Sequence, residues 1–412
     1  MTKQAISLML GIALSWSLLT AFSPQSSRAA GVPVHANSTV HGTLNKNHTV
    51  DLWDLTLPRD GSLKCTLTKD ATLSAGVNLL PGDDPSGKSD IAFMGGNTLV
   101  YPQAGKGHYI IQVIRIGSGF GESQGSYSLA IAYTPNAGAN DPHTTSSTAR
   151  TSAISLAATG PARGHLGYFL GKQPTGFHAS IFDDSDLYKI TLPSNGSLSI
   201  TAKTDAALPS VRLELWNAKG DKITGEWNAV GNPQLSRGTY YLNVTRQDAG
   251  YNGNYGAYTL TSKMTPPSLP EYKPNPLDAK HAAPLALGKI ISGNLGYMLM
   301  GRDSMGQFTY TNTNWFRIGV RGTGMQLRVD VATEATMSSA TIALFDASGI
   351  RQIASANGSG SAVLYLPTTT PGTYLVSVTR ADPCYAGNYG AYRLRVLSGK
   401  TNLQSAQALH IK

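Results

Sequence analysis

The sequence contains one pattern that could support nucleophilic catalysis, Gly-Glu-Ser-Gln-Gly at 121–125. It matches the Gly-x-Ser-x-Gly arrangement of a serine hydrolase, in which the serine stands on a strained turn between a strand and a helix. Here the pattern lies in a Gly- and Ser-rich loop before the strand-like stretch SYSLAIAY, and the related loops later in the chain have no such serine. We therefore expect no catalytic residue, and a serine esterase using Ser123 is the least favoured alternative.

A second pattern could bind a cation. Asp183, Asp184 and Asp186 form the cluster DDSD just before a strand-like stretch, and Ca²⁺ takes about six to eight oxygen ligands, often from loop carboxylates. These three residues are a candidate calcium site. The alternative is that the aspartates cap a turn, since the third repeat has TNTN here and EF-hand spacing is absent. The histidines lack metal-ligand spacing, and no motif requires a cofactor.

The hexapeptide GNYGAY occurs twice, at 253–258 and at 387–392. Tyrosine combines an apolar face with a polar tip, which suits sugar rings and protein surfaces. The candidate ligand-binding residues near the two copies are Tyr251, Tyr255, Tyr385 and Tyr389. Packing within the loop is the alternative for all four side chains.

The last tyrosine of each hexapeptide has a different interpretation. Tyr258 and Tyr392 both match Tyr127 in an earlier, more divergent stretch, GSYSL. A side chain present in all three places is expected to be structural, with its hydroxyl group holding a loop.

These residues lie in three copies of one unit. GHLGYFLG at 164 corresponds to GNLGYMLM at 293, and RGTYYLNVTR corresponds to PGTYLVSVTR. Stretches such as YYLNVT alternate apolar and polar residues with a period of two, which predicts β-strands. NAKG and DASG between such stretches predict tight hairpin turns. No stretch shows the pattern of an amphipathic helix.

The order of the motifs resembles the bacterial pre-peptidase C-terminal domain family. The quoted stretches that carry this resemblance are DLWDLTLP, DLYKITLP, RDGSL, SNGSL, LWNAKGD, LFDASGI and GTYYLNVTR. The first repeat departs from it, with PGDDPSGKSD in place of the central hairpin. The resemblance implies a secreted bacterial protein with jelly-roll-like sandwiches, of the kind usually appended to an enzyme. No catalytic domain accompanies the repeats here.

The predicted fold is therefore all-β, with three tandem antiparallel β-sandwich domains joined by linkers. The expected boundaries are a signal peptide at 1–29, repeats at 34–134, 161–264 and 289–397, linkers at 135–160 and 265–288, and a polar tail at 398–412. The first linker is rich in Ser, Thr and Ala. The second is rich in proline, which favours an extended spacer.

The first residues have the features of a cleaved signal peptide: a basic start, an apolar core and small residues near Ala29. Cleavage would remove Lys3 and Arg28 and lower the net charge from +9 to +7. We expect a secreted or periplasmic protein without a transmembrane anchor. The basic residues are scattered, so no nucleic-acid partner is expected. Of the two cysteines, Cys65 alternates with Leu63 and Leu67 and is predicted to be buried, and no disulfide is expected.

The sequence thus favours a secreted, non-catalytic, multi-module binding protein. Its expected partner is an extracellular polysaccharide, a protein surface or another envelope component, and an enzyme or secretion system encoded nearby is a further candidate. The alternative is a structural, spacer or self-assembling envelope or matrix protein that binds no small ligand.

Overall fold

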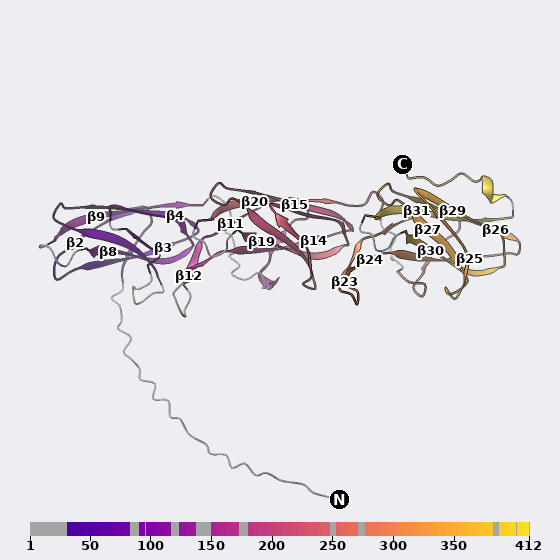
Figure 1. Ribbon diagram of the computed structural model, residues 1–412, viewed down its shortest axis with the longest axis horizontal. Helices are drawn as coiled ribbons and strands as arrows, with labels where there is room; N and C mark the ends of the chain where they lie inside the picture. The colour runs from indigo at the N-terminus through magenta and orange to yellow at the C-terminus, as the bar shows by residue number, and fades with distance from the viewer. Residues whose placement is uncertain are drawn as a thin grey trace, which may run out of the picture. The chain divides into compact units, whose positions relative to one another are not determined.

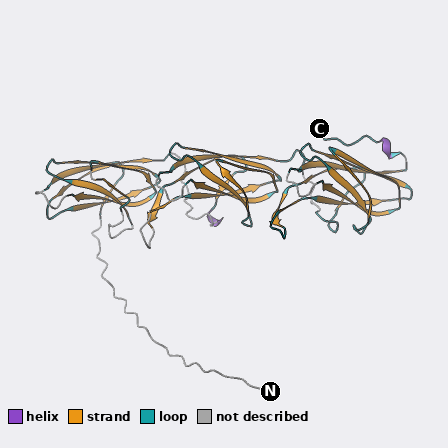
Figure 2. Ribbon diagram, viewed as in Figure 1, coloured by secondary structure: helices purple, strands orange, loops and turns teal. Residues whose placement is uncertain are grey.

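A computed structural model describes most of the chain (Figure 1). The described residues are 31–82, 90–94, 96–116, 123–136, 150–172, 180–247, 253–270, 277–381, 387–400 and 402–411. The predicted signal peptide lies outside them. Strands make up nearly all of the regular structure of these residues (Figure 2), together with the short 3₁₀ helices η1 and η2. The prediction of an all-β chain of tandem antiparallel sandwiches is confirmed.

The chain divides into two compact units, of which the first comprises residues 1–56, 66–99 and 108–130 and the second 57–65, 100–107 and 131–412. Strands β3, β4, β7, β8 and β9 each have residues in both. The strands of the first repeat are β1 (Val32–Val34), β2 (Ser38–Leu44), β3 (Val50–Leu57), β4 (Gly61–Lys69), β5 (Ala75–Pro81), β6 (Ala92–Met94), β7 (Thr98–Ala104), β8 (Gly107–Arg115) and β9 (Gly125–Pro135). They form sheets of order β1-β3-β8-β5-β6 and β2-β9-β4-β7.

The second repeat begins with a short 3₁₀ helix, η1 (Arg150–Ser152). Its strands are β10 (Ile154–Leu156), β11 (Gly160–Leu166), β12 (Phe169–Lys172), β13 (Ser180–Phe182), β14 (Ser185–Leu192), β15 (Gly196–Thr204), β16 (Val211–Asn217), β17 (Lys222–Trp227), β18 (Ala229–Leu235), β19 (Gly238–Arg246) and β20 (Gly256–Thr265). One sheet has the order β10-β14-β19-β16-β17. The other runs β11-β20-β15-β18 and continues into β23 and β24 of the third repeat.

The third repeat has the same plan. Its strands are β21 (Ala283–Pro284), β22 (Ile290–Leu295), β23 (Met298–Arg302), β24 (Phe308–Tyr310), β25 (Thr313–Val320), β26 (Met325–Thr333), β27 (Ala340–Phe345), β28 (Gln352–Gly358), β29 (Ser361–Thr369), β30 (Gly372–Arg380) and β31 (Gly390–Gly399). Its sheets run β21-β25-β30-β27-β28 and β22-β31-β26-β29.

Period-two alternation places the core between the paired sheets of each repeat. In β4 the side chains of Leu63, Cys65 and Leu67 are at most 1% exposed, which confirms that Cys65 is a buried hydrophobe. β16 follows the same rule, with Leu213 and Leu215 inside and their neighbours half-buried outside. Burial of these apolar faces is the main source of stability in such sandwiches.

The repeat boundaries differ from those expected. β1, β10 and β21 pair in parallel with β3, β14 and β25, so each of these short strands extends its sandwich on the N-terminal side. β10 and η1 occupy the end of the first expected linker, and β21 lies in the second. Strands of two or three residues are too short to show a periodic pattern, which is why β10 and β21 were expected to be linker.

The tail also differs from its expected role as a simple polar extension. Arg328, which is nearly fully buried, donates hydrogen bonds to the carbonyl oxygens of Leu403, Gln404 and Ala406. The Nε atom of Arg328 lies 2.7 Å from Asp330 Oδ1. The short helix η2 (Leu403–Ser405) is therefore held against the third repeat by a buried arginine. Among the described residues, no helix is long and apolar enough to cross a membrane.

Candidate functional site

Ser123 takes part in the backbone scaffold of its loop. Its Oγ accepts a hydrogen bond from the backbone N–H of Ser74 at 2.7 Å, and its carbonyl oxygen accepts one from Arg115 Nε at 2.6 Å. Strand β9 begins two residues later, where a nucleophile elbow would need a helix. The local structure therefore gives the esterase alternative no support.

The last tyrosine of each repeated motif is buried and hydrogen-bonded, as expected for a structural residue. Tyr127 donates to Asp51 Oδ2 at 2.6 Å, and Tyr258 donates to Asp186. Tyr392 accepts from Asn314 Nδ2 at 2.8 Å. These bonds tie the last strand of each repeat to the strand that opens with DLW, DLY or NWF, so the residue belongs to the scaffold.

The three aspartates of the candidate calcium site have separate structural partners. Asp184 Oδ1 accepts from Arg246 Nε at 2.6 Å, and Asp186 accepts from Tyr258. The backbone of Asp183 exchanges two hydrogen bonds with residues 167 and 168. Within the part of the chain that the structure describes, no three His, Cys, Asp or Glu side chains are arranged to hold a metal ion.

The third repeat provides an internal comparison for these aspartates. Asn312 Oδ1 accepts from Arg380 as Asp184 does from Arg246, and Asn314 Nδ2 donates to the Tyr392 hydroxyl group where Asp186 accepts from that of Tyr258. Amides thus replace two of the carboxylates without loss of the contacts. Calcium at Asp183, Asp184 and Asp186 stays a prediction, and the contacts seen for these residues need no metal.

Each copy of GNYGAY is held in place by its own buried arginine. Arg246 Nη1 donates to the carbonyl oxygen of Asn254 at 2.9 Å, and Arg380 Nη1 donates to that of Asn388 at 2.9 Å. Each arginine also lies over an aromatic ring, 5.3 Å from its centroid. The Arg115–Ser123 bond occupies the same position in the first repeat, so Gln124 is the counterpart of the second tyrosine.

The held loops present Tyr255 and Tyr389 to tyrosines of the same repeat. Tyr255 meets Tyr168 edge-to-face at 6.2 Å, and Tyr389 meets Tyr297 in the same way at 6.1 Å. The structure therefore places these two predicted residues, both half-buried, in aromatic packing. Tyr251 and Tyr385 lie outside the described residues. The contacts favour the loop-packing alternative for Tyr255 and Tyr389.

The tyrosine pairs stand at the base of a hairpin that joins one repeat to the preceding one. We call β23–β24 the joint hairpin of the third repeat. Gln234 Nε2 of the second repeat donates to the carbonyl oxygen of Gly296 at 2.8 Å, and Ser236 Oγ donates to that of Met298. Leu235 forms a parallel bridge with Met298. Met298 is 3% exposed and belongs to the hydrophobic core of the second repeat.

An ion pair fixes the far end of the same joint. Arg302 Nε lies 3.1 Å from Asp221 Oδ1, and Arg302 also donates to the carbonyl oxygen of Lys222. The joint hairpin thus lies in a groove of the second repeat between the β16–β17 turn and the end of β18. This groove combines an apolar floor, donors for backbone carbonyls and one carboxylate.

The second repeat has an equivalent hairpin, β12–β13. Within the second compact unit, Gln103 Nε2 donates to the carbonyl oxygen of Gly167 at 2.7 Å, which repeats the Gln234–Gly296 bond. A Cβ atom at Gly105 would lie 1.9 Å from the carbonyl oxygen of Phe169, so this close approach requires glycine. Burial raises the pKa of Tyr168 to about 12, which keeps its hydroxyl group neutral in the joint.

A separate pocket lies on the outer face of the second repeat and has a volume of about 440 Å³. It is lined by Arg150, Leu187, Glu214, Trp216, Lys219, Gly220, Tyr241 and Asn243. Trp216 and Tyr241 are directly opposite each other on β16 and β19, and so are Glu214 and Asn243. The cross-strand register therefore brings two aromatic rings and two polar groups to one face.

Charged groups border this pocket. The Arg150 guanidinium lies 4.9 Å from the centroid of the Tyr241 ring and donates to the carbonyl oxygen of Ala218 at 2.6 Å. Burial acts to raise the pKa of Glu214, but hydrogen bonds from Lys222 and Arg212 outweigh it and lower the pKa. Glu214 is therefore ionised at neutral pH. The pocket presents aromatic faces beside cations, a carboxylate and an amide.

The other repeats have different residues at these positions. In the third repeat, Phe345 and Leu375 replace Trp216 and Tyr241, and Trp315 packs against Phe345 at 4.9 Å. In the first repeat the equivalent pair is Leu80 and Ile110. Trp216 and Tyr241 were not among the residues expected to bind a ligand, although the period-two pattern of LELWN and YYLNV puts both outside. Each residue is predicted to face outward, but only the register between β16 and β19 shows that the two side chains are neighbours.

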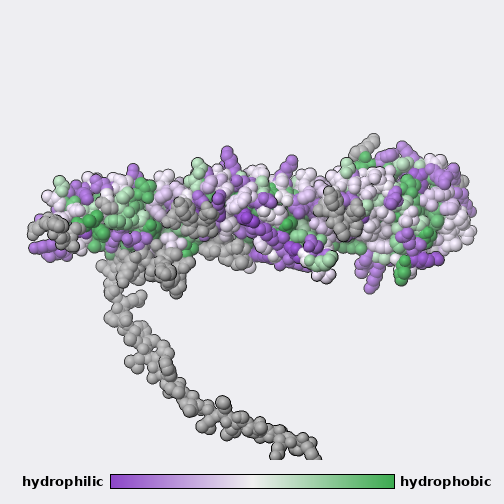
Figure 3. All heavy atoms as spheres, viewed as in Figure 1, coloured by the Kyte–Doolittle hydropathy of each residue, from purple (hydrophilic) through white to green (hydrophobic). Residues whose placement is uncertain are grey.

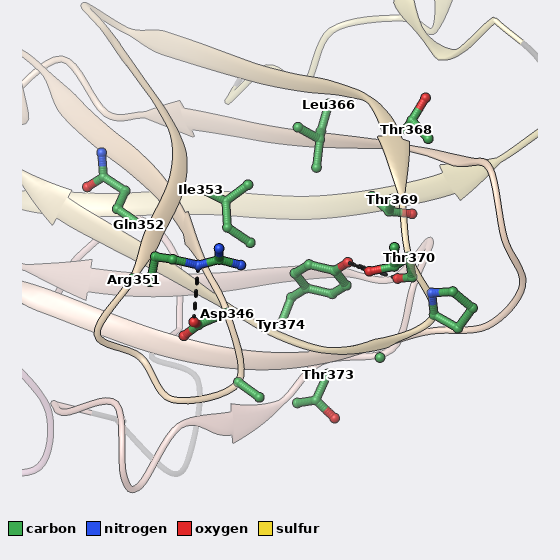
Figure 4. A pocket seen from close by; sticks show the side chains of 13 residues that line it. Asp346, Arg351, Gln352, Ile353, Leu366, Thr368, Thr369, Thr370, Thr373 and Tyr374 are labelled. Carbon is green, nitrogen blue, oxygen red and sulfur yellow. Dashed lines mark hydrogen bonds and ion pairs between the residues drawn. The ribbon is translucent and has the colours of Figure 1, made fainter.

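The third repeat has a pocket of its own, of about 660 Å³ (Figure 4). It lies between the β27–β28 turn, which carries Asp346 and Arg351, and the end of β29 with the loop that follows it. In the close view, Ile353, Leu366 and Tyr374 gather around one space. On the face drawn in Figure 3, hydrophobic residues reach the surface as separate groups among hydrophilic ones. Ile350, which precedes the pocket residue Arg351 in sequence, is 86% exposed.

No family model matches the chain, and no curated protein matches it significantly. Among solved structures it is similar to the pre-peptidase C-terminal domain of a collagenase from Bacillus anthracis, with 17% identity, 25% of this chain and 94% of that one covered, and a TM-score of 0.21. It is also similar to a periplasmic inhibitor of g-type lysozyme from Aeromonas hydrophila, with 20% identity, 25% of this chain and 96% of that one covered, and a TM-score of 0.22. For the tandem CBM22 domains of a Paenibacillus barcinonensis protein, the identity is 11%, the coverage is 59% of this chain and 94% of that one, and the TM-score is 0.16. These similarities are too low to assign a family or a function.

Proposed function

We propose that the chain is a secreted, non-catalytic protein of tandem binding modules that engages an extracellular polysaccharide. The observation that carries the proposal is the outer-face pocket of the second repeat, where Trp216 and Tyr241 stand side by side with polar and charged groups around them. The leader-like sequence at 1–29 supports secretion.

The chemistry of the pocket fits a sugar polymer. Half-buried aromatic rings offer apolar faces on which the C–H faces of sugar rings can pack. Glu214 and Asn243 supply hydrogen-bond acceptors and donors for hydroxyl groups. Lys219 and Arg150 add positive charge, which favours polymers with carboxylate or sulfate groups.

The experiment is a pull-down of the mature protein on a panel of insoluble neutral and acidic polysaccharides. The test variant is Trp216→Ala with Tyr241→Ala, and the matched control is Trp227→Ala, because Trp227 is 48% exposed on the edge strand of the same sheet. We expect retention of the native protein and of the control, and about tenfold weaker binding of the double variant. Equal retention of all three proteins, or retention of none, would refute the proposal.

The tyrosines selected from the sequence form a second arm of this experiment. If Tyr255→Ala with Tyr389→Ala weakens binding as much as the pocket variant does, the ligand contacts the GNYGAY loops. Our expectation is that this variant retains binding and loses stability, because both rings pack against tyrosines of their own repeats.

A structural role is the second candidate function, and the repeated joint is the observation that favours it. Gln103 and Gln234 make the same bond to the following repeat, so consecutive modules are fastened by side-chain contacts as well as by their linkers. In this case the chain would be a spacer that binds no polymer. Light scattering over a range of concentrations distinguishes the self-assembling form of this role from a monomeric binding protein.

A further inference from the structure

The groove that receives the joint hairpin in the second repeat has a counterpart in the third. In the second repeat, β18 would be the last strand of its sheet if the joint hairpin of the third repeat did not extend it. In the third repeat, β29 ends the order β22-β31-β26-β29. Among the described residues β29 pairs with β26 alone, which leaves its outer edge available for a further strand.

The two grooves correspond residue by residue. Ile223 packs against the core that contains Met298, and Ile353 lies at the matching position on the floor of the third-repeat pocket. Ser236 and Thr370 each follow the edge strand, and the carbonyl oxygen of each accepts a hydrogen bond from the tyrosine four residues later. Thr370 therefore retains the hydroxyl group with which Ser236 binds the backbone of the joint hairpin.

The charge at the rim is reversed between the two grooves. The backbone N–H of Asn217 donates to the carbonyl oxygen of Asp221, and that of Asp346 donates to the carbonyl oxygen of Arg351. Arg351 therefore takes the turn position of Asp221, the residue that pairs with Arg302 in the second repeat. Arg351 lies 3.4 Å from Asp346, and its side chain is 76% exposed. An incoming arginine at this point lacks the carboxylate partner that Asp221 supplies in the second repeat, and an incoming carboxylate shares the exposed Arg351 guanidinium with Asp346.

A second copy of this chain does not offer a matching hairpin from its first repeat. Where the later repeats have Gly-Tyr-Phe or Gly-Tyr-Met, the first has Asn-Lys-Asn at 45–47. Asn45 closes a tight turn there, with its Oδ1 accepting from the backbone of Asn47 and His48. Lys46 at this turn would also meet Arg351 with like charge. The first repeat of a second copy is therefore a poor occupant of this groove, and we place the occupant on another protein.

We propose that this groove of the third repeat docks an acidic β-hairpin of a partner protein by strand addition to β29. The partner places an apolar side chain on the Ile353–Leu366 floor and a carboxylate against Arg351. One of its backbone carbonyls accepts a hydrogen bond from the hydroxyl group of Thr370, which in this structure bonds to the Tyr374 hydroxyl group at 3.1 Å. The second repeat shows this mode of binding within the same chain, and strand addition is a general mode of peptide recognition. This surface is independent of the proposed polysaccharide pocket.

The test uses peptides derived from the joint hairpin itself. A head-to-tail cyclised peptide of residues 295–311 is made with the native Arg302 and with Arg302→Glu, because an uncyclised two-stranded hairpin is only marginally stable. Calorimetric titration measures both peptides against the mature native protein and against Arg351→Asp. Asp221 and the intramolecular hairpin keep the acidic peptide out of the second-repeat groove.

The expected result is a reversal of preference. The native protein binds the acidic peptide about two- to fivefold more tightly than the basic one, as for an exposed ion pair, and Arg351→Asp inverts the order. Loss of the apolar contact by Met298→Ala in the acidic peptide weakens binding at least tenfold. Failure of the native protein to bind the acidic peptide overturns the proposal, and so does an order of preference that Arg351→Asp leaves unchanged.

Discussion

Truncation of Met298 tests the joint between the second and third repeats most sharply. Its side chain belongs to the third repeat by sequence, but it is 3% exposed in the hydrophobic core of the second. Replacement of a buried methionine by alanine costs about 2–5 kcal/mol. Since Met298 lies at the edge of that core, where neighbours can partly fill the space, we expect about 2 kcal/mol. A loss of this size reduces the coupling between the two repeats about 30-fold.

Scanning calorimetry is the assay, because unfolding of a multi-domain chain is not a single two-state transition. We expect the native second and third repeats to unfold together and the Met298→Ala variant to show two separated transitions. Met305→Ala is the control, since Met305 lies in the turn of the same hairpin and is 80% exposed. Equal thermograms for the two variants would refute the assignment of Met298 to the core of its neighbour.

Two further predictions concern ionisation. A hydrogen bond from Asn217, followed by the contacts with Arg302, lowers the pKa of Asp221 below its ordinary value of 3.8. The Asp221–Arg302 ion pair therefore contributes to the free energy of unfolding above pH 3.8, and this contribution is lost as the pH falls through the lower pKa of the folded state. The separation between native and Asp221→Asn thermograms should therefore close below pH 3.8, and a separation that persists at lower pH would contradict this. Burial raises the pKa of the Cys65 thiol to about 12, so a Cys384→Ser variant should resist iodoacetamide at about pH 8 until it is denatured. Labelling of the folded variant would show that Cys65 is accessible.

The sequence predicted the fold class and the structural role of the last tyrosine. Alternation in stretches such as GSLKCTLT and YYLNVT directly reflects the two faces of a strand, so the buried positions followed from it. Tyr258 and Tyr392 were identified as scaffold because Tyr127 occupies the same place in the divergent first repeat. Three repeats in one chain separate a scaffold residue, which all three share, from residues found in only two.

Long-range contacts could not be predicted in the same way. Tyr255 and Tyr389 had the composition of a binding loop, but their partners, Tyr168 and Tyr297, lie far away in sequence. Arg246 and Asp184 are likewise paired only by the fold. The Trp216–Tyr241 face depends on the register between β16 and β19, which alternation alone leaves open.

The account rests on the pocket of the second repeat as a polymer-binding surface. The most direct measurement is a binding isotherm of the mature protein on a polysaccharide that retains it, compared with Trp216→Ala alone. If the pocket binds the polymer, binding is saturable, and Trp216→Ala weakens it several-fold while the calorimetric unfolding profile stays unchanged. An isotherm identical for the two proteins would contradict it.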